Sequence, residues 1–378
     1  GFAAMDRHHQ AKLLDSLQNV LSAEAKKQDS TLHVDIDAFY EGNRYYATTY
    51  QDFTDLRLVF TVPKSMGKFG GETDNWMWPR QTCDFSVFRI YADKNNRPAA
   101  YNKDNVPYHP KHWAPVSLQG YKQGDFSMTM GYPGSTSRYL SSYGIRERRD
   151  ALNAPRAQVR GVKQDVMTRH MRASEAVRIK YDSKFAQSAN YWKNSIGMNK
   201  CIDSIGLIAQ KQRYEDIIRH WQDSTSYLKG QLDFDKMARL YNERFEPRKA
   251  AMYFQETFLR TNELTDRALK ALTSMTKKDK KGDYVTFADN SNTWDASLDK
   301  DVQAVLLKNY REHVDAKYLP AFYQIIDKKF GGDYQKYVNY LWETSALMKK
   351  DAKVYVTKKA IKKDAGLQYG TQLKAIDR

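Results

Sequence analysis

Apolar and polar residues alternate with different periods in different parts of the chain. Between residues 11 and 27, leucine and valine recur at steps of three and four, which predicts an amphipathic helix. From residue 32 to about 131, runs with a period of two predict half-buried strands at Leu56–Phe60, Ser86–Ile90 and Phe126–Met130. Most of the prolines lie in this second part, where they punctuate loops. The pattern therefore predicts one helix followed by an all-β segment.

The apolar period of the remaining chain is helical. Asp333 follows a Gly-Gly turn and is a predicted N-cap, whereas Pro247 and Pro320 are predicted to break helices. The apolar stripes at helical spacing are Cys201, Ile205 and Ile208, then Tyr214, Ile218 and Trp221, and finally Tyr334, Val338 and Leu341.

The composition is that of a globular protein with more than one core. The chain has 378 residues, of which 41% are hydrophobic and 28% charged, and this length is sufficient for two domains. No apolar run approaches the roughly 18 residues of a membrane-spanning helix. The opening Gly-Phe-Ala-Ala lacks the basic and apolar regions of a signal peptide. No membrane span is therefore expected.

The net charge of +16 arises in the second part of the chain. Residues 1–135 carry 15 Lys and Arg against 15 Asp and Glu, whereas residues 136–378 carry 46 against 30. The excess follows helical segments, which is typical of solvated helix faces, and the lysine-rich stretch 277–283 is predicted to be an exposed loop. No zinc-ligand spacing, RNP-like string or heptad-backed basic region accompanies it, so no nucleic-acid partner is expected.

The cysteines and histidines do not form a metal-ligand pattern. Cys83 and Cys201 are too few for a disulfide framework or a structural zinc site, and whether they pair stays open. His8 and His9 are adjacent and would point in different directions from a helix. No metal and no organic cofactor are expected.

The stretch Gly70–Phe88, G-G-E-T-D-N-W-M-W-P-R-Q-T-C-D-F-S-V-F, combines turn glycines, polar groups and large aromatic side chains. Asn75, Trp76 and Trp78 precede an isolated acid, Asp84, at the start of a predicted strand. Taken singly, an asparagine beside a tryptophan is typical of a turn, and the aspartate is typical of a strand cap or a partner for Arg80. The combination indicates a binding wall joined to a catalytic carboxylate.

The string G-K-F-G-G-x-T-D-N-W-M-W-P-R-x-T-x-D-F-S at Gly67–Ser86 resembles the signature of the bacterial serine dipeptidyl aminopeptidases. Further similar strings follow in order between residues 39 and 194, namely F-Y-E-G-N-R-Y-Y, V-P-K-S-M-G-K-F, D-N-V-P-Y-H-P-K-H, M-G-Y-P-G and A-N-Y-W-K-N. That family combines a chymotrypsin-like double β-barrel with a large helical cap inserted between the barrels.

The resemblance implies a β + α multidomain fold, with a partial chymotrypsin-like antiparallel β-barrel followed by a mainly α-helical cap domain. Residues 1–137 are expected to form part of the first barrel, and residues 138–378 an incomplete cap domain. The opening Gly-Phe-Ala-Ala-Met-Asp faintly resembles the sequence after the family's catalytic histidine. The chain is therefore expected to be an internal fragment.

The resemblance also implies roles for individual residues. A serine protease triad needs an acid that holds the histidine in its reactive tautomer, and the family pattern places this acid at Asp84. Recognition of a free peptide N-terminus needs acceptor oxygens for a strongly hydrated ammonium group. The resemblance assigns this task to Asn75, Trp76 and Asn190, the last of which lies in A-N-Y-W-K-N. We call these three residues the amine anchor.

Some features depart from the family pattern. Gln81 stands where the family commonly has histidine, and Cys83 where it commonly has glycine. No His-His-Cys-Gly type segment and no Gly-x-Ser-Gly type loop occur in the sequence, so the catalytic histidine and serine have no candidates. The chain alone is therefore expected to be inactive.

The sequence thus predicts a serine-type dipeptidyl aminopeptidase that releases dipeptides from peptide N-termini through an acyl-enzyme. This chain would supply the triad acid and the amine anchor but neither the serine nor the histidine. Peptides with a free N-terminus are the expected partners, a homodimer is left open, and a periplasmic or cell-surface location is implied. The alternative is a catalytically inactive peptide-binding relative. A third interpretation, a basic helical scaffold that binds nucleic acid or anionic surfaces, predicts binding that weakens steeply with salt.

Overall fold

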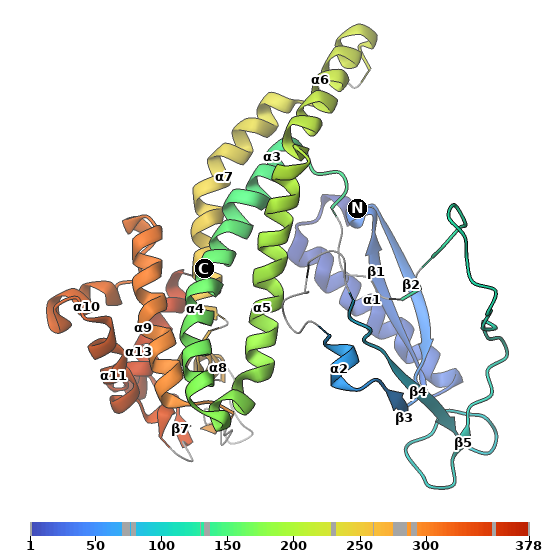
Figure 1. The fold of residues 1–378 in the computed structure, drawn as a ribbon, viewed down its shortest axis with the longest axis horizontal. Helices are drawn as coiled ribbons and strands as arrows, with labels where there is room; N and C mark the ends of the chain where they lie inside the picture. Colours follow the sequence, from blue (N-terminus) through green and yellow to red (C-terminus); the bar gives the residue numbers. More distant parts are fainter. Residues whose placement is uncertain are drawn as a thin grey trace. The chain divides into compact units, whose positions relative to one another are not determined.

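The computed structural model describes residues 2–69, 76, 81–128, 130–131, 137–227, 232–259, 261–274, 286–288, 293–349 and 353–376. These residues form two compact units (Figure 1). Unit 1 comprises the described residues of 1–70 and 81–132, and unit 2 comprises Trp76 and the described residues of 133–378. Each unit is described by itself.

The first long element of unit 1 is helix α1 (Arg7–Gln28), which confirms the helix predicted between residues 11 and 27. Side chains of α1 form hydrogen bonds with the backbone of strand β1 (Leu32–Phe39), at the edge of this strand that is not paired with another strand. The Ser22 hydroxyl accepts from the Val34 N–H and donates to the Val34 carbonyl, both at 3.0 Å. Helix α1 thereby covers a sheet edge that would otherwise be open to pairing.

The strands of unit 1 form two small antiparallel sheets. Strand β1 pairs with β2, and the second sheet has the order β3-β4-β5, with an irregularity between Leu58 and Phe60. Among the described residues these sheets do not close into a barrel, so the partial chymotrypsin-like barrel stays a prediction. The remaining elements of unit 1 are the 3-10 turns Phe2–Ala4 and Tyr40–Gly42, β2 (Arg44–Gln51), β3 (Asp55–Thr61), the short helix α2 (Lys64–Gly67), β4 (Ser86–Ala92) and β5 (Val106–Pro107).

The predicted strands Leu56–Phe60 and Ser86–Ile90 are confirmed, but their predicted burial is wrong. Leu58 is 58% exposed and Phe88 is 61% exposed. The predicted strand near Phe126 is also wrong, because residues 126–128 have no strand pairing.

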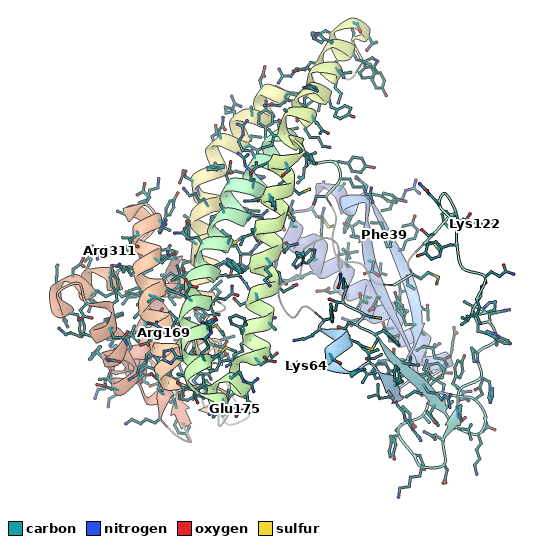
Figure 2. All side chains as sticks on the ribbon, in the orientation of Figure 1. Phe39, Lys64, Lys122, Arg169, Glu175 and Arg311 are labelled. Atoms are coloured by element: carbon teal, nitrogen blue, oxygen red, sulfur yellow. The ribbon has the colours of Figure 1, made fainter. Side chains whose placement is uncertain are left out.

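Unit 2 is built from long helices. Helices α4 (Ala154–Ala173) and α5 (Glu175–Ser204) are joined by one residue, Ser174, and run side by side; Figure 2 shows Arg169 and Glu175 at the same end of the pair. The other elements are α3 (Ser142–Arg146), the π-helical segments Glu147–Asn153 and Gln255–Leu259, α6 (Leu207–Thr225), α7 (Phe234–Phe254), α8 (Glu263–Ser274), β6 (Thr286–Ala288), α9 (Ala296–His313), the 3-10 turns Ala316–Tyr318 and Ala346–Met348, α10 (Phe322–Phe330), α11 (Tyr334–Thr344), β7 (Lys353–Tyr355), α12 (Lys358–Lys363) and α13 (Ala365–Ile376).

An aromatic core holds unit 2 together. The Phe322 ring is fully buried, and its centroid lies 4.9 Å from those of Tyr323 and Tyr369. The Phe258 and Tyr310 ring centroids are also 4.9 Å apart. Such pairs add attraction beyond their buried area. The core therefore fixes α9, α10, α13 and the segment Gln255–Leu259 against one another.

Local signals placed several of these helices correctly. The Asp333 carboxylate accepts from the Lys336 N–H at 2.9 Å, which confirms the predicted N-cap, and Val338 of the same helix is fully buried. Pro320 separates the turn Ala316–Tyr318 from α10, as predicted. The predicted loop 277–283 lies outside the described residues.

Pro247 does not break a helix, because it lies inside α7. An interior proline costs about 3 kcal/mol. Arg244 forms two 2.7 Å hydrogen bonds with Glu147 before this proline, and Phe254 is buried after it. Tertiary contacts on both sides therefore outweigh the local penalty.

Two further features differ from the predictions. The stripe that begins at Cys201 crosses a break between α5 and α6, where Gly206 has a left-handed φ of 60°. The side chains continuing it on α6 are exposed, Tyr214 at 62% and Trp221 at 45%. In addition, β6 and β7 pair within the helical unit, which the helical periodicity did not predict.

Candidate functional site

Helix α5 positions Asn190, one of the predicted amine-anchor residues. Its neighbours Ser188 and Ala189 are buried in unit 2, whereas Asn190 itself is partly exposed at the helix surface. Gly197 follows seven residues later, about two helical turns, and therefore lies on the same face of α5.

Trp76 lies on this face of α5. Its indole Nε1–H donates a hydrogen bond to Asn190 Oδ1 at 2.9 Å, across 114 residues of sequence. Its backbone has a left-handed φ of 61°, an uncommon conformation for a residue with a side chain. The structure therefore brings together two of the residues that the sequence assigned to the amine anchor.

Gly197 allows the Trp76 backbone to approach the helix closely. A Cβ added at Gly197 would lie 3.4 Å from the Trp76 carbonyl oxygen and 3.8 Å from the Trp76 Cβ. A larger side chain at this position would occupy the space that Trp76 now fills. Trp76 thus contacts α5 at two points, Asn190 and Gly197.

The pair Trp76–Asn190 offers two kinds of group to a cation. An amide oxygen can accept two hydrogen bonds, and that of Asn190 accepts the one from the indole. Trp76 is 51% exposed, and the face of an indole ring attracts an ammonium group. The third predicted anchor residue, Asn75, lies outside the described residues.

Asp84 belongs to unit 1, where it is exposed just before β4. Its Oδ1 would lie 3.7 Å from a Cβ added at Gly67, so the carboxylate lies beside α2. The Cys83 N–H donates to the Met66 carbonyl at 3.2 Å and ties the loop to this helix. Among the described residues, no hydrogen bond or ion pair joins Asp84 to a histidine.

Two histidines of unit 1 contact other acids. His9 Nδ1 lies 2.6 Å from the Asp6 carboxylate, which also caps α1, and His33 Nδ1 lies 2.9 Å from the Asp52 carboxylate. His8 and His9 lie in the first turn of α1, ahead of the predicted start of this helix, with ring centroids 5.9 Å apart. Both contacts are local to α1 and to the β1–β2 hairpin.

Sequence reasoning missed Gly197. The available signal was a glycine in the middle of a long helix, where it costs about 1 kcal/mol relative to alanine. Its spacing of seven residues from Asn190 adds to that signal. A glycine that lowers helix stability, on the same helix face as a candidate binding residue, indicates that another segment of the chain approaches the helix closely there.

Other site features concern the cysteines, metals and membranes. Cys83 and Cys201 are both free and exposed. Within the part of the chain that the structure describes, no three His, Cys, Asp or Glu side chains are grouped as metal ligands would be. None of the described helices is both long and apolar enough to cross a membrane.

A family model described as Peptidase S46 matches residues 2–369 of the chain. Among curated proteins, the chain is similar to dipeptidyl-peptidase 7 of Porphyromonas gingivalis, with 42% identity over 88% of this chain and 48% of that protein. It is also similar to an Asp/Glu-specific dipeptidyl-peptidase of Capnocytophaga gingivalis, with 34% identity over 98% of this chain and 54% of that protein. The chain spans about half the length of the curated relatives it matches.

Solved structures show the same similarity. The crystal structure of Porphyromonas endodontalis DPP11 in complex with the dipeptide Arg-Glu has a TM-score of 0.75 and 28% identity, covering 96% of this chain and 54% of that one. The same protein in an alternate conformation has a TM-score of 0.57. The helix-rich fold with few antiparallel strands therefore agrees with that of solved dipeptidyl-peptidases.

Proposed function

The chain belongs to the peptidase S46 family, and we propose that it takes part in releasing dipeptides from the amino termini of peptides. The matched relatives are dipeptidyl-peptidases by name, and one related structure holds a dipeptide. The observation that carries the proposal is the hydrogen bond between Trp76 and Asn190, two residues assigned to the amine anchor from their motifs alone.

In the proposed role, the Trp76 indole fixes the orientation of the Asn190 amide so that its oxygen faces the bound amino terminus. An ammonium group that leaves water needs charge-assisted hydrogen bonds in return, each worth about 1.5–3 kcal/mol. The Asn190 oxygen offers one acceptor, the exposed indole face adds a cation–π contact, and Asn75 would supply further acceptors. A substrate whose amino group is acetylated has no such cation.

We further propose a serine-type reaction through an acyl-enzyme, with Asp84 as the acid that orients the histidine base. The serine and the histidine have no candidates in this chain, so we expect it to be inactive alone. Residues 1–137 would form part of a chymotrypsin-like barrel and residues 138–378 the helical cap. The exposed apolar side chains of β3 and β4 support this, because a second half of a barrel would cover them. A periplasmic or cell-surface location and a homodimer belong to the same proposal.

The test uses the full-length protein, with fluorogenic dipeptidyl substrates that carry a free or an acetylated amino group. Asn190→Ala is expected to lower kcat/KM at least tenfold for the free-amine substrate, since one charge-assisted hydrogen bond is lost. Asn339→Ala, an amide truncation on α11, is the matched control and should leave kcat/KM unchanged. Equal activity of Asn190→Ala and wild type on free-amine substrates would remove the amine anchor from the proposal.

The catalytic role of Asp84 is tested in the same protein. Asp84→Asn is expected to lower kcat by about 10⁴ because the histidine tautomer is no longer held. Asp104→Asn, which changes another exposed acid of unit 1, should retain activity. A fully active Asp84→Asn enzyme would show that this carboxylate is not the triad acid.

A second candidate function is an inactive peptide-binding relative. It is favoured by the surroundings of Asp84 in the described part of unit 1, where no hydrogen bond or ion pair joins the carboxylate to a histidine. Such a protein would bind peptides with free amino termini, and this binding would weaken in Asn190→Ala. Detectable release of dipeptides by the complete protein excludes it.

A further inference from the structure

A cavity of about 350 Å³ lies inside unit 2, apart from the face of α5 that contacts Trp76. It is bounded by α4, α5, the segment Gln255–Leu259, the start of α8, and α9. Its volume lies at the lower end of the range for small-molecule pockets and far exceeds the space needed by one water molecule. The cavity is therefore large enough for a small organic molecule.

Basic side chains of α4 and α5 line this cavity. Arg160 and Lys163 come from α4, one turn apart, and Lys184 comes from α5 at the exposed end. The Arg160 guanidinium lies 4.9 Å above the Tyr191 ring and donates to the Ser188 carbonyl at 3.3 Å, so its position is fixed. Burial, with the repulsion of Arg160, lowers the pKa of Lys163 to about 8.

The acids near the cavity do not balance these cations. Glu256 is shared by two guanidinium groups, those of Arg156 at 3.0 Å and Arg160 at 2.7 Å. The cavity lining itself carries three basic groups, Arg160, Lys163 and Lys184, and three acidic groups, Glu263, Asp266 and Asp299. Arg160 pairs with Glu256, and Glu263 and Asp266 pair with Arg267 and Lys270, which lie outside the lining. Beyond these pairs the lining contributes two basic groups, Lys163 and Lys184, and one acidic group, Asp299, and this local excess favours an anionic ligand.

Ser188 adds a polar group without a protein partner. The residue lines the cavity and is only 4% exposed, and its Oγ has no hydrogen-bond partner among the described residues. A buried hydroxyl without a partner costs about 1–3 kcal/mol. An acceptor atom of a ligand would remove this cost.

The rest of the lining is apolar. The side chains of Met167, Phe258, Leu298 and Val302 are almost completely buried around the cavity. They provide an apolar surface for a hydrocarbon group, next to the surface formed by the basic side chains. The cavity thus combines a cationic end with an apolar wall.

We propose that this cavity binds a small organic carboxylate, whose carboxylate group meets Lys163 and Ser188 and whose apolar part packs against Phe258 and Met167. A dianion such as phosphate is less well suited, because the buried carboxyl group of Asp299 lies in the same cavity. The proposal does not depend on the proposed peptidase function.

The probe is N-acetyl-leucine, titrated by isothermal calorimetry into the complete protein. Its acetyl group blocks the amine, so it does not report on Trp76 or Asn190. Saturable binding is expected, with at least tenfold weaker binding of N-acetyl-leucinamide, which lacks the negative charge. Inorganic phosphate should not displace the probe. Absence of saturable binding, or displacement by phosphate at equal concentration, would overturn the proposal.

Variants locate the site. Lys163→Met, which keeps the chain length without the charge, is expected to weaken binding at least tenfold, and Ser188→Ala several-fold. Lys308→Met, an exposed lysine on α9 outside the cavity, is the matched control and should bind as wild type does. Thermal melts report whether each variant folds, and Ser188→Ala carries the test if Lys163→Met does not. Unchanged affinity in a folded Lys163→Met or Ser188→Ala protein would refute this site.

Discussion

Substitutions at Gly197 test whether the close approach of Trp76 to α5 matters for function. A Cβ at this position would lie 3.4 Å from the Trp76 carbonyl oxygen, which is ordinary van der Waals contact. Gly197→Ala should therefore fit without moving Trp76. The larger side chain of Gly197→Leu would extend into the space that the Trp76 backbone occupies, and Trp76 would have to move.

The two variants are expected to have opposite effects. Alanine is about 0.8–1 kcal/mol better than glycine in a helix interior, so Gly197→Ala should raise the free energy of unfolding by up to that amount. For a cooperative unit of 150–250 residues, about 1 kcal/mol corresponds to about 2–4 °C in Tm. Gly197→Leu should instead lose the hydrogen bond from Trp76 to Asn190 and lower kcat/KM for free-amine substrates at least tenfold.

The assay combines thermal unfolding with kcat/KM for free-amine and acetylated substrates in the complete peptidase. Lys200→Leu places the same side chain at an exposed position of α5 and is the control for added bulk. Either of two results would refute the reasoning: a fall in Tm for Gly197→Ala, or kcat/KM values of Gly197→Leu that match those of Lys200→Leu.

Two further predictions concern buried charges of unit 2. Glu256→Gln leaves Arg156 and Arg160 without their shared carboxylate and is expected to cost about 3–5 kcal/mol in urea unfolding, whereas Glu243→Gln, in an exposed pair, should change stability by less than about 0.5 kcal/mol. Equal losses of unfolding free energy in Glu256→Gln and Glu243→Gln would show that the buried ion pairs of Glu256 do not contribute more to stability than an exposed pair. Burial raises the pKa of Asp299 to about 6, so folding favours its protonated form. Protonated Asp299 therefore contributes to the free energy of unfolding below about pH 4. Roughly 3 kcal/mol of this contribution is lost as the pH rises from about 4 to about 6. The difference in unfolding free energy between wild type and Asp299→Asn should therefore fall between pH 4 and pH 6 and stay constant above; a constant difference throughout would contradict the raised pKa.

Local patterns predicted many elements of the fold. The period of three and four residues placed α1, alternation placed the strands at Leu56–Phe60 and Ser86–Ile90, and Asp333 placed the start of α11. These signals depend on residues within a few positions of one another, so they do not require the tertiary structure. They predicted the wrong burial for β3 and β4, because burial depends on which layer covers a sheet.

Proline and glycine show where local rules were insufficient. Pro320 separates two helical elements as predicted, yet Pro247 lies inside α7, where contacts such as Arg244 with Glu147 hold the helix on its N-terminal side. The apolar stripe through Ile205 was expected to continue, but Gly206 takes a left-handed conformation and ends α5. In both places the tertiary structure decided between conformations that the sequence allowed.

The sequence by itself determined the family motifs, the helical second part and the residues proposed for the amine anchor. Only the tertiary structure placed Trp76 against Asn190 across 114 residues and brought its backbone next to Gly197 of α5. It alone also gathered Arg160, Lys163 and Asp299 around one cavity. The physical reason is that periodicity and capping act between neighbours in the sequence, whereas close approach, desolvation and charge balance depend on segments that meet only when the chain is folded.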